Sequence, residues 1–142
     1  LKKVFETVKP LVKGRIIHVS GATGRRYPEK RSLLGALAGR YADIVIVTDE
    51  DPYDEDPSVI IADVVAGVKR GTDRRRSLEH NVNLFTILDR AEAIRKALSL
   101  AKPNDLVLIT GKGDEAVMAI GDQLVPFSDR EVVANALSGS QD

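Results

Sequence analysis

Short apolar runs alternate with segments of helical pattern through most of the chain, and this alternation limits the possible folds more than any other feature. The runs are rich in Val and Ile, as buried strands are, and they predict strands over residues 15–21, 43–48, 82–88 and 105–110. Strands separated by helices pair in parallel through right-handed crossovers. The sequence therefore predicts an α/β fold with a Rossmann-like, mostly parallel sheet and helices on both faces.

The segments between these runs carry helix signals at their ends. Helices are predicted over residues 1–9, 30–42, 57–71, 89–102 and 128–137. The third begins at Pro57 and ends near Gly71, and the fourth has Asp89 as its N-cap with a glutamate three residues later, as in a capping box. Before the last helix, VMAI-GD-QLVPF predicts a hairpin that turns at Gly121-Asp122 and adds an antiparallel edge to the sheet.

The composition bounds the class of protein. A chain of 142 residues is expected to form one domain. Lys plus Arg and Asp plus Glu are equal at 21 each, so no overall charge favours a nucleic acid or a membrane surface as partner. Cysteine is absent and no apolar run reaches the roughly 20 residues that span a bilayer, so a cytoplasmic protein is expected. Because the chain starts at Leu1 inside a helical pattern, we expect it to be a fragment of a longer chain.

Three loops of unusual composition follow the predicted strands. They are SGATGRRYPEK after the first strand, DEDPYDED after the second and GKGDE after the fourth. In parallel α/β sheets, ligands bind beyond the carboxyl ends of the strands, where such loops meet. The candidate site is therefore expected at this edge, with an acidic loop facing a basic, glycine-containing one.

The acidic loop admits three interpretations: a solvated loop, a divalent-metal site, or a pocket for a cationic group. Residues 54–56 suit the amino end of the following helix, where the helix dipole stabilises negative charge. Asp49 and Asp51 would supply the oxygen ligands of a Mg²⁺ site. Glu50 and Asp51, nearest to the strand end, are the candidates for contact with a cationic group.

The two glycine-containing loops are candidates for anion binding. GATGRR lacks the P-loop and dinucleotide-binding patterns, but glycines at a helix start let backbone N–H groups approach an anion. Gly24, Lys30 and Arg31 are the candidate contacts for an anion or a nucleotide. In GKGDE, free backbone N–H groups suit a carboxylate or phosphate, while Glu115 can accept from an ammonium group. An ordinary turn explains either loop as well.

Several blocks together resemble the carboxy-terminal domain of the Mur ligases. These are VSGATGRRYPEKRSLLG, IVIVTDEDPYDEDPSVIIADVVAGV, DRAEAIRKAL, DLVLITGKGDE and FSDREVVANAL, which keep the family's order and spacing over nearly the whole chain. The most similar members add the third amino acid to UDP-N-acetylmuramoyl-dipeptide in peptidoglycan synthesis. The resemblance implies two further domains, ATP and Mg²⁺ bound mainly by the central one, and a free amino acid whose amine attacks an acyl phosphate. It implies that this domain delivers the amino acid, has no catalytic residue of its own and is inactive alone.

The resemblance also implies roles for single residues. Arg26 stands where a family arginine contacts the amino acid, although the preceding family Asp is Arg25 here. Gly111 and Glu115 match substrate-contacting positions of the family block GKGHE, whose His is replaced by Asp114. These positions are therefore expected to contact the amino acid.

The acidic loop departs from the family pattern. Ligases that select meso-diaminopimelate carry D-N-P-R, whose arginine pairs with the distal carboxylate, whereas this chain has E-D-P-Y and places Tyr53 there. With Glu50, Asp51 and Glu115 around the pocket, a distal ammonium is favoured over a distal carboxylate. We therefore expect a lysine-type basic amino acid as substrate, and no metal at this loop.

Two other interpretations stay open. One is another Mur-related ligase, of the folylpolyglutamate or cyanophycin synthetase type. The other is a nucleotide- or anion-binding Rossmann-like module without ligase activity. A P-loop in sequence preceding Leu1 would favour a ligase over the second of these.

Overall fold

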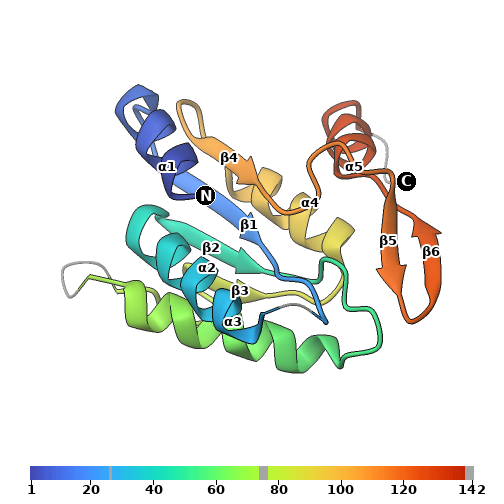
Figure 1. Cartoon of the computed structure of the whole chain (residues 1–142). Coiled ribbons are helices and arrows are strands. Elements are labelled where there is room, and N and C mark those ends of the chain that lie inside the picture. The colour runs from blue at the N-terminus through green and yellow to red at the C-terminus, as the bar shows by residue number, and fades with distance from the viewer. Residues whose placement is uncertain (26, 74–76, 140–142) are drawn as a thin grey trace.

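The fold is built around a parallel β-sheet. The computed structural model describes residues 1–25, 27–73 and 77–139. Its central strands are β1 (Ile16–Ser20), β2 (Ile44–Val47), β3 (Leu84–Thr86) and β4 (Leu106–Ile109). They pair in parallel in the order β3-β2-β1-β4, and all of them point toward the same edge (Figure 1). The predicted α/β class with a parallel sheet is confirmed.

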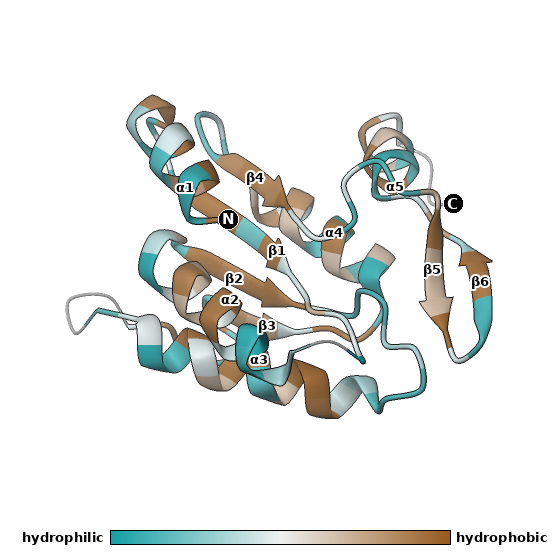
Figure 2. Cartoon of the chain, viewed as in Figure 1, coloured by the Kyte–Doolittle hydropathy of each residue, from teal (hydrophilic) through white to brown (hydrophobic). Residues whose placement is uncertain are grey.

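Helices cover both faces of this sheet. They are α1 (Lys2–Val8), α2 (Pro28–Tyr41), α3 (Pro57–Gly71), α4 (Arg90–Leu100) and α5 (Asp129–Leu137), with a short 3₁₀ helix at Lys9–Leu11. One buried cluster joins α1, α2 and α3 to the sheet and includes Phe5, Ala38 and Val64. A second cluster joins α4 and α5 to the opposite face through Ile94 and neighbouring apolar residues. Two cores on two faces explain why the strands are apolar on both sides, as Figure 2 shows for β2 and β4.

The helix starts follow the predicted capping chemistry. The side chain of Asp56 accepts a hydrogen bond from the N–H of Ser58 at the start of α3, and Asp89 accepts from Glu92 at the start of α4. At α5 the cap is Ser128. Within the parts of the chain that the structure describes, no helix is long and apolar enough to cross a membrane.

The structure corrects two details of the prediction. The third strand is limited to Leu84–Thr86, because residues 81–83 form a turn in which Asn81 has φ 63°. The hairpin β5 (Val117–Ile120) and β6 (Gln123–Pro126) forms, but as a separate two-stranded sheet and not as an added edge of the parallel sheet. It is held instead by the loop after β2, where Tyr53 exchanges two backbone hydrogen bonds with the hairpin.

The pair α2 and α3 packs backbone against backbone through glycines. A Cβ added at Gly35 would overlap the carbonyl oxygen of Val64, and one added at Gly67 would overlap that of Ser32. Gly39 and Gly71 make equivalent contacts one turn further along. No side chain fits between the two helices at these positions, so the packing of this layer requires glycine.

This contact predicts that Gly67→Ala, unlike its neighbour Ala66→Gly, has the opposite sign to the one that helix propensity gives. Helix propensity alone would make Gly67→Ala stabilising by about 1 kcal/mol and Ala66→Gly destabilising by about the same. Because α2 blocks the space beside Gly67, we expect Gly67→Ala to lower the free energy of unfolding by about 3 kcal/mol. Ala66→Gly, at an exposed position, should lower it by only about 1 kcal/mol. Urea denaturation measures both, and a stabilised Gly67→Ala variant would contradict the packing described.

Candidate functional site

Three loops meet at the carboxyl edge of the sheet, as their positions after β1, β2 and β4 predict. The N–H of Gly24, in the loop after β1, donates to the carbonyl of Asp51 in the loop after β2 (2.8 Å). Asp51 in turn accepts from the ammonium group of Lys112 in the loop after β4, also at 2.8 Å. Between these contacts, the side chain of Glu50 lies directly against Gly111. Arg26 lies outside the described residues, so its predicted place beside Glu50 and Glu115 stays a prediction.

Glu50 is a mostly buried acidic residue of this edge, and its carboxylate is not fully enclosed. Its residue is 6 % exposed, and within the described residues its carboxylate accepts no hydrogen bond. Burial raises the pKa of Glu50 to about 7. The nearby cations Arg90 and Lys112 act in the opposite direction, while the acidic neighbours Asp51 and Glu115 raise the pKa further. A cation brought into contact with Glu50 would therefore stabilise its ionised form.

Lys112 is a site residue that sequence analysis missed. It is 2 % exposed, and its Nζ donates to Oδ1 of Asp51 (2.8 Å) and to Oε2 of Glu115 (3.2 Å). Asp51 also accepts from the backbone N–H of Ala119 in β5. The charges of Asp51 and Glu115, predicted to face a ligand, are thus shared with an internal lysine. The sequence signal that could have indicated this ion pair was the spacing of three residues between Lys112 and Glu115 in GKGDE.

The same contact bears on the metal interpretation of the acidic loop. A Mg²⁺ ion held by Asp49 and Asp51 would lie close to the ammonium group that Asp51 already binds. The side chain of Asp49 accepts from the N–H of Glu50 at 3.0 Å. Across residues 1–25, 27–73 and 77–139, no three His, Cys, Asp or Glu side chains gather as metal ligands would.

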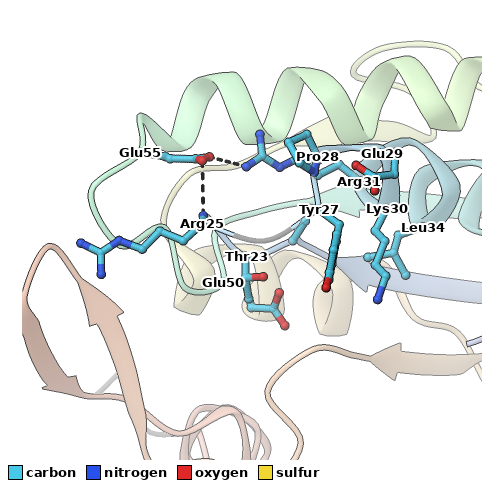
Figure 3. Close-up of a pocket in the computed structure, with 11 residues that line it drawn as sticks. Thr23, Arg25, Tyr27, Pro28, Glu29, Lys30, Arg31, Leu34, Glu50 and Glu55 are labelled. Carbon is cyan, nitrogen blue, oxygen red and sulfur yellow. Dashed lines mark hydrogen bonds and ion pairs between the residues drawn. The ribbon is translucent and has the colours of Figure 1, made fainter.

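Glu50 faces a cavity of about 830 Å³ on the side of the loop after β1. Its lining includes Tyr27, Lys30 and Leu34 from the start of α2. In Figure 3 the carboxylate of Glu50, the hydroxyl of Tyr27 and the ammonium of Lys30 all point to one side, away from α3. The volume suits a small-molecule ligand, and Glu50 and Lys30 each direct a charged group toward it.

Of the three predicted anion contacts, Lys30 is the one whose polar group faces this cavity. Its Nζ lies 4.8 Å from the ring centroid of Tyr27. Arg31 is 4 % exposed and pairs with Glu55 and with Asp63, so its guanidinium fastens α2 to α3. The N–H of Gly24 is already used by the acidic loop.

The second half of the acidic loop is explained by arginines as well as by the helix start. Only Asp56 caps α3. Asp54 accepts from Nε of Arg25 at 2.8 Å, and Glu55 pairs with Arg31. The prediction that residues 54–56 mostly serve the helix start thus holds for Asp56, whereas Asp54 and Glu55 pair with arginines. Arg25 also lies over the ring of Tyr53, with its Cζ 5.2 Å from the ring centroid.

Comparison with known proteins decides the family. Residues 1–113 match the family model described as "Mur ligase, glutamate ligase domain". The chain belongs to the Mur ligase family. The resemblance noted in the sequence is confirmed, and the Rossmann-like arrangement of the sheet and its edge loops is that of a Mur ligase domain.

Several relatives of this Mur ligase domain have names that state an activity. It is 40 % identical over 141 residues to a UDP-N-acetylmuramoyl-L-alanyl-D-glutamate–2,6-diaminopimelate ligase of Caldanaerobacter subterraneus, covering 99 % of this chain and 27 % of that protein. It is 42 % identical over 137 residues to a UDP-N-acetylmuramyl-tripeptide synthetase of Roseiflexus, covering 96 % and 26 %. A solved diaminopimelate ligase structure superposes with a TM-score of 0.82 at 33 % identity, covering 97 % of this chain and 26 % of that one. The chain thus spans about a quarter of the length of these relatives.

The burial of Glu50 predicts a trade-off between stability and ligand binding. A carboxyl whose pKa is about 7 in the fold and about 4.5 in the unfolded chain opposes folding once it is ionised. We expect Glu50→Gln to raise the free energy of unfolding by up to about 3 kcal/mol at pH 8. The gain should be absent below pH 4, grow between the two pKa values and stay constant above the higher one.

Denaturant unfolding at several pH values measures this difference. The matched control is Glu6→Gln, which changes an exposed glutamate paired only with exposed Lys2 and should alter stability by no more than about 0.5 kcal/mol at any of these pH values. A Glu50→Gln variant that is less stable than the parent at pH 8 would mean that Glu50 has a cationic partner in the free protein.

Proposed function

We propose that this chain is the carboxy-terminal domain of an ATP-dependent ligase that adds a basic amino acid to UDP-N-acetylmuramoyl-dipeptide in peptidoglycan synthesis. The amino acid would be the third residue of the peptide, joined through an acyl phosphate of the dipeptide's carboxyl group. The ligase would work in the cytoplasm with the amino-terminal and central domains of the same chain. Support comes from the family and from the names of relatives that this chain matches over nearly its whole length.

The observation that carries the substrate class is the mostly buried residue Glu50, whose carboxylate lines the cavity and accepts no hydrogen bond within the described residues. A side-chain ammonium that contacts it replaces lost hydration with a charge-assisted hydrogen bond, worth about 1.5–3 kcal/mol. A neutral or acidic side chain would leave the carboxylate without a partner or repel it. This favours an amino acid with a second amino group, and diaminopimelate and lysine both have one.

Tyr53 bears on the choice between these two amino acids. By the family resemblance, an arginine at this position pairs with the distal carboxylate of diaminopimelate. Tyr53 offers no such charge, and nearby Arg25 is shared with Asp54. We therefore infer a lysine-type substrate, although relatives of this chain are named diaminopimelate ligases.

The remaining residues would act through the two loops that carry Glu50 and Gly111. Lys112 holds Asp51 and Glu115 in place, so these two acids shape the site and lend it part of their charge. Gly111 has φ 108°, and any side chain there would collide with Glu50. Glycine at this position thus leaves room for the side chain of Glu50.

ATP with Mg²⁺ would supply the activated phosphate, bound mainly by the central domain. In this domain Lys30 suits a phosphate group, because its ammonium faces the cavity and forms no ion pair within the described residues. Arg31 does not suit it, since two carboxylates already bind its guanidinium. The domain's own task is to orient the amino acid so that its α-amine can reach the activated carboxyl group.

The ligation reaction tests the proposal directly. The full-length protein is incubated with ATP, UDP-N-acetylmuramoyl-dipeptide and one of three amino acids: lysine, ornithine or meso-diaminopimelate. We expect ligation, with kcat/KM for lysine or ornithine about tenfold or more above that for diaminopimelate, because the distal carboxylate lacks a partner. Preference for diaminopimelate would reject the lysine-type assignment, and no ligation with any of them would reject the ligase proposal.

A single substitution at Tyr53 should shift the preference between the two amino acids in the opposite direction. Tyr53→Arg restores the arginine of the diaminopimelate ligases and should raise kcat/KM for diaminopimelate while that for lysine falls or stays level. Tyr53→Lys is the matched control, because it adds the charge without the two-pronged geometry of a guanidinium and should give a smaller gain. If both variants leave the preference between the amino acids unchanged, Tyr53 is not part of the substrate pocket.

A further inference from the structure

Arg90 is a buried cation that lies behind the candidate site. It follows the N-cap of α4 and is 2 % exposed. Its Nε and one terminal nitrogen donate to the two carboxylate oxygens of Asp129, at 2.7 and 2.8 Å. Its two terminal nitrogens also donate to the backbone carbonyls of Asp49 (3.0 Å) and Thr110 (2.9 Å). The four contacts join α4, α5 and the loops after β2 and β4.

The two carbonyl contacts lie where the sheet no longer holds these loops. β2 and β4 are not neighbours, because β1 lies between them. The backbone hydrogen bonds that link them through β1 end at Thr48 and Thr110, which donate to Ser20 and Val19. Beyond that point Arg90 bridges from one loop to the other. Each carbonyl that it binds belongs to the residue immediately before Glu50 or Gly111.

The Glu50–Gly111 contact is therefore held by interactions of the residues that precede and follow it in both loops. Arg90 holds the preceding pair, Asp49 and Thr110, and Lys112 with Asp51 forms the following pair. A lysine could not replace Arg90, because one ammonium group cannot present donors in the fixed plane that reaches a carboxylate and two carbonyls together. A small error in the spacing of the loops would move Glu50 relative to the cavity.

We propose that Arg90 is a positioning residue for the amino-acid site: by bridging the carbonyls of Asp49 and Thr110, it sets the spacing at which Glu50 faces its ligand. The inference rests on the proposed function for its kinetic consequence, but the bridging geometry does not. Arg90 does not touch the ligand, since its side chain is fully buried behind the loops.

The matched control for Arg90 is Arg15, at the opposite end of the sheet. Arg15 also binds a carboxylate twice, through Asp105 at 3.2 and 2.8 Å, and a backbone carbonyl, that of Leu100 at 3.0 Å. It precedes β1, so it ties the chain at the amino-terminal edge, away from Glu50. Arg15→Lys and Arg90→Lys thus remove the same kind of contact at two ends of one sheet.

The first measurement is steady-state kinetics of the full-length protein with its preferred amino acid. We expect Arg90→Lys to raise KM for the amino acid about tenfold or more, since displacement of a binding group by about 1 Å can cost up to about a hundredfold. KM for ATP should stay within about twofold. Arg15→Lys should leave both KM values within the same limit, although both variants lose thermal stability. Equal effects of the two variants on KM for the amino acid would overturn the positioning role.

The second measurement follows the loops themselves and needs no substrate. Amide hydrogen exchange is compared over residues 49–53 and 110–115 in the parent protein and in both variants. We expect faster exchange in these segments for Arg90→Lys and unchanged exchange there for Arg15→Lys. If exchange is unaltered in Arg90→Lys, the bridge does not hold the loops and the inference fails.

The two measurements separate the possible failures. A protein that ligates no amino acid but shows the expected exchange pattern refutes the proposed function and retains the bridging geometry. If Arg90→Lys does not fold, Asp129→Asn serves in its place, because it weakens the grip on the guanidinium while both carbonyl contacts remain possible. That variant should show the same pattern with a smaller rise in KM, and a normal KM with normal exchange would count against the proposal.

Discussion

Two buried cations, Arg90 and Lys112, hold the loops after β2 and β4 together, and the candidate site depends on them. Burial of unpaired charge is costly, so a cluster of acidic residues at a sheet edge would otherwise protonate or move apart. Lys112 pairs with Asp51 and Glu115, while Arg90 pairs with Asp129 and binds two backbone carbonyls. Glu50 lies between them with its carboxylate unpaired. Glu50 is thus presented to the cavity beside Asp51 and Glu115, whose charges are paired with Lys112.

This arrangement is consistent with the family to which the chain belongs. The parallel sheet of this Mur ligase domain places the acidic loop and the glycine-containing loops at a single edge, where the proposed amino acid would be held. The glycine contacts between α2 and α3 bring the backbones of these helices close together beside the loop after β1. Burial raises the pKa of Glu50, so its ionised form is expected to oppose folding, as residues at binding sites often do.

The sequence was sufficient for the architecture because its local signals agreed with one another. Residues 57–71 form α3 within the predicted bounds, since Pro57, the basic residues of the last turn and Gly71 mark both ends. The third strand was predicted too long because an apolar pattern does not reveal the turn at Asn81. The hairpin was placed on the sheet edge because its attachment to Tyr53 is a tertiary contact with no local signal.

Only part of the site could be predicted from the sequence, because its remaining contacts are tertiary and have no local signal. The loops and Glu50 follow from the rule for strand ends, but the roles of Lys112 and Arg90 do not. A lysine between glycines and an arginine after an N-cap are normally solvated, and only the folded structure shows that both are buried against specific oxygens. The partners of Asp54 and Glu55 were likewise hidden, because Arg25 comes from the loop after β1 and Arg31 from α2.

The central claim is that an ionised Glu50 receives the side-chain ammonium of the amino acid. Its most direct test is the pH dependence of kcat/KM for lysine in the full-length protein and in Glu50→Gln. With a pKa of about 7, set by burial among Asp51, Glu115, Arg90 and Lys112, kcat/KM should fall about tenfold per pH unit below that value in the parent protein. The variant should have a lower kcat/KM without this inflection. The same inflection in both proteins would contradict the account.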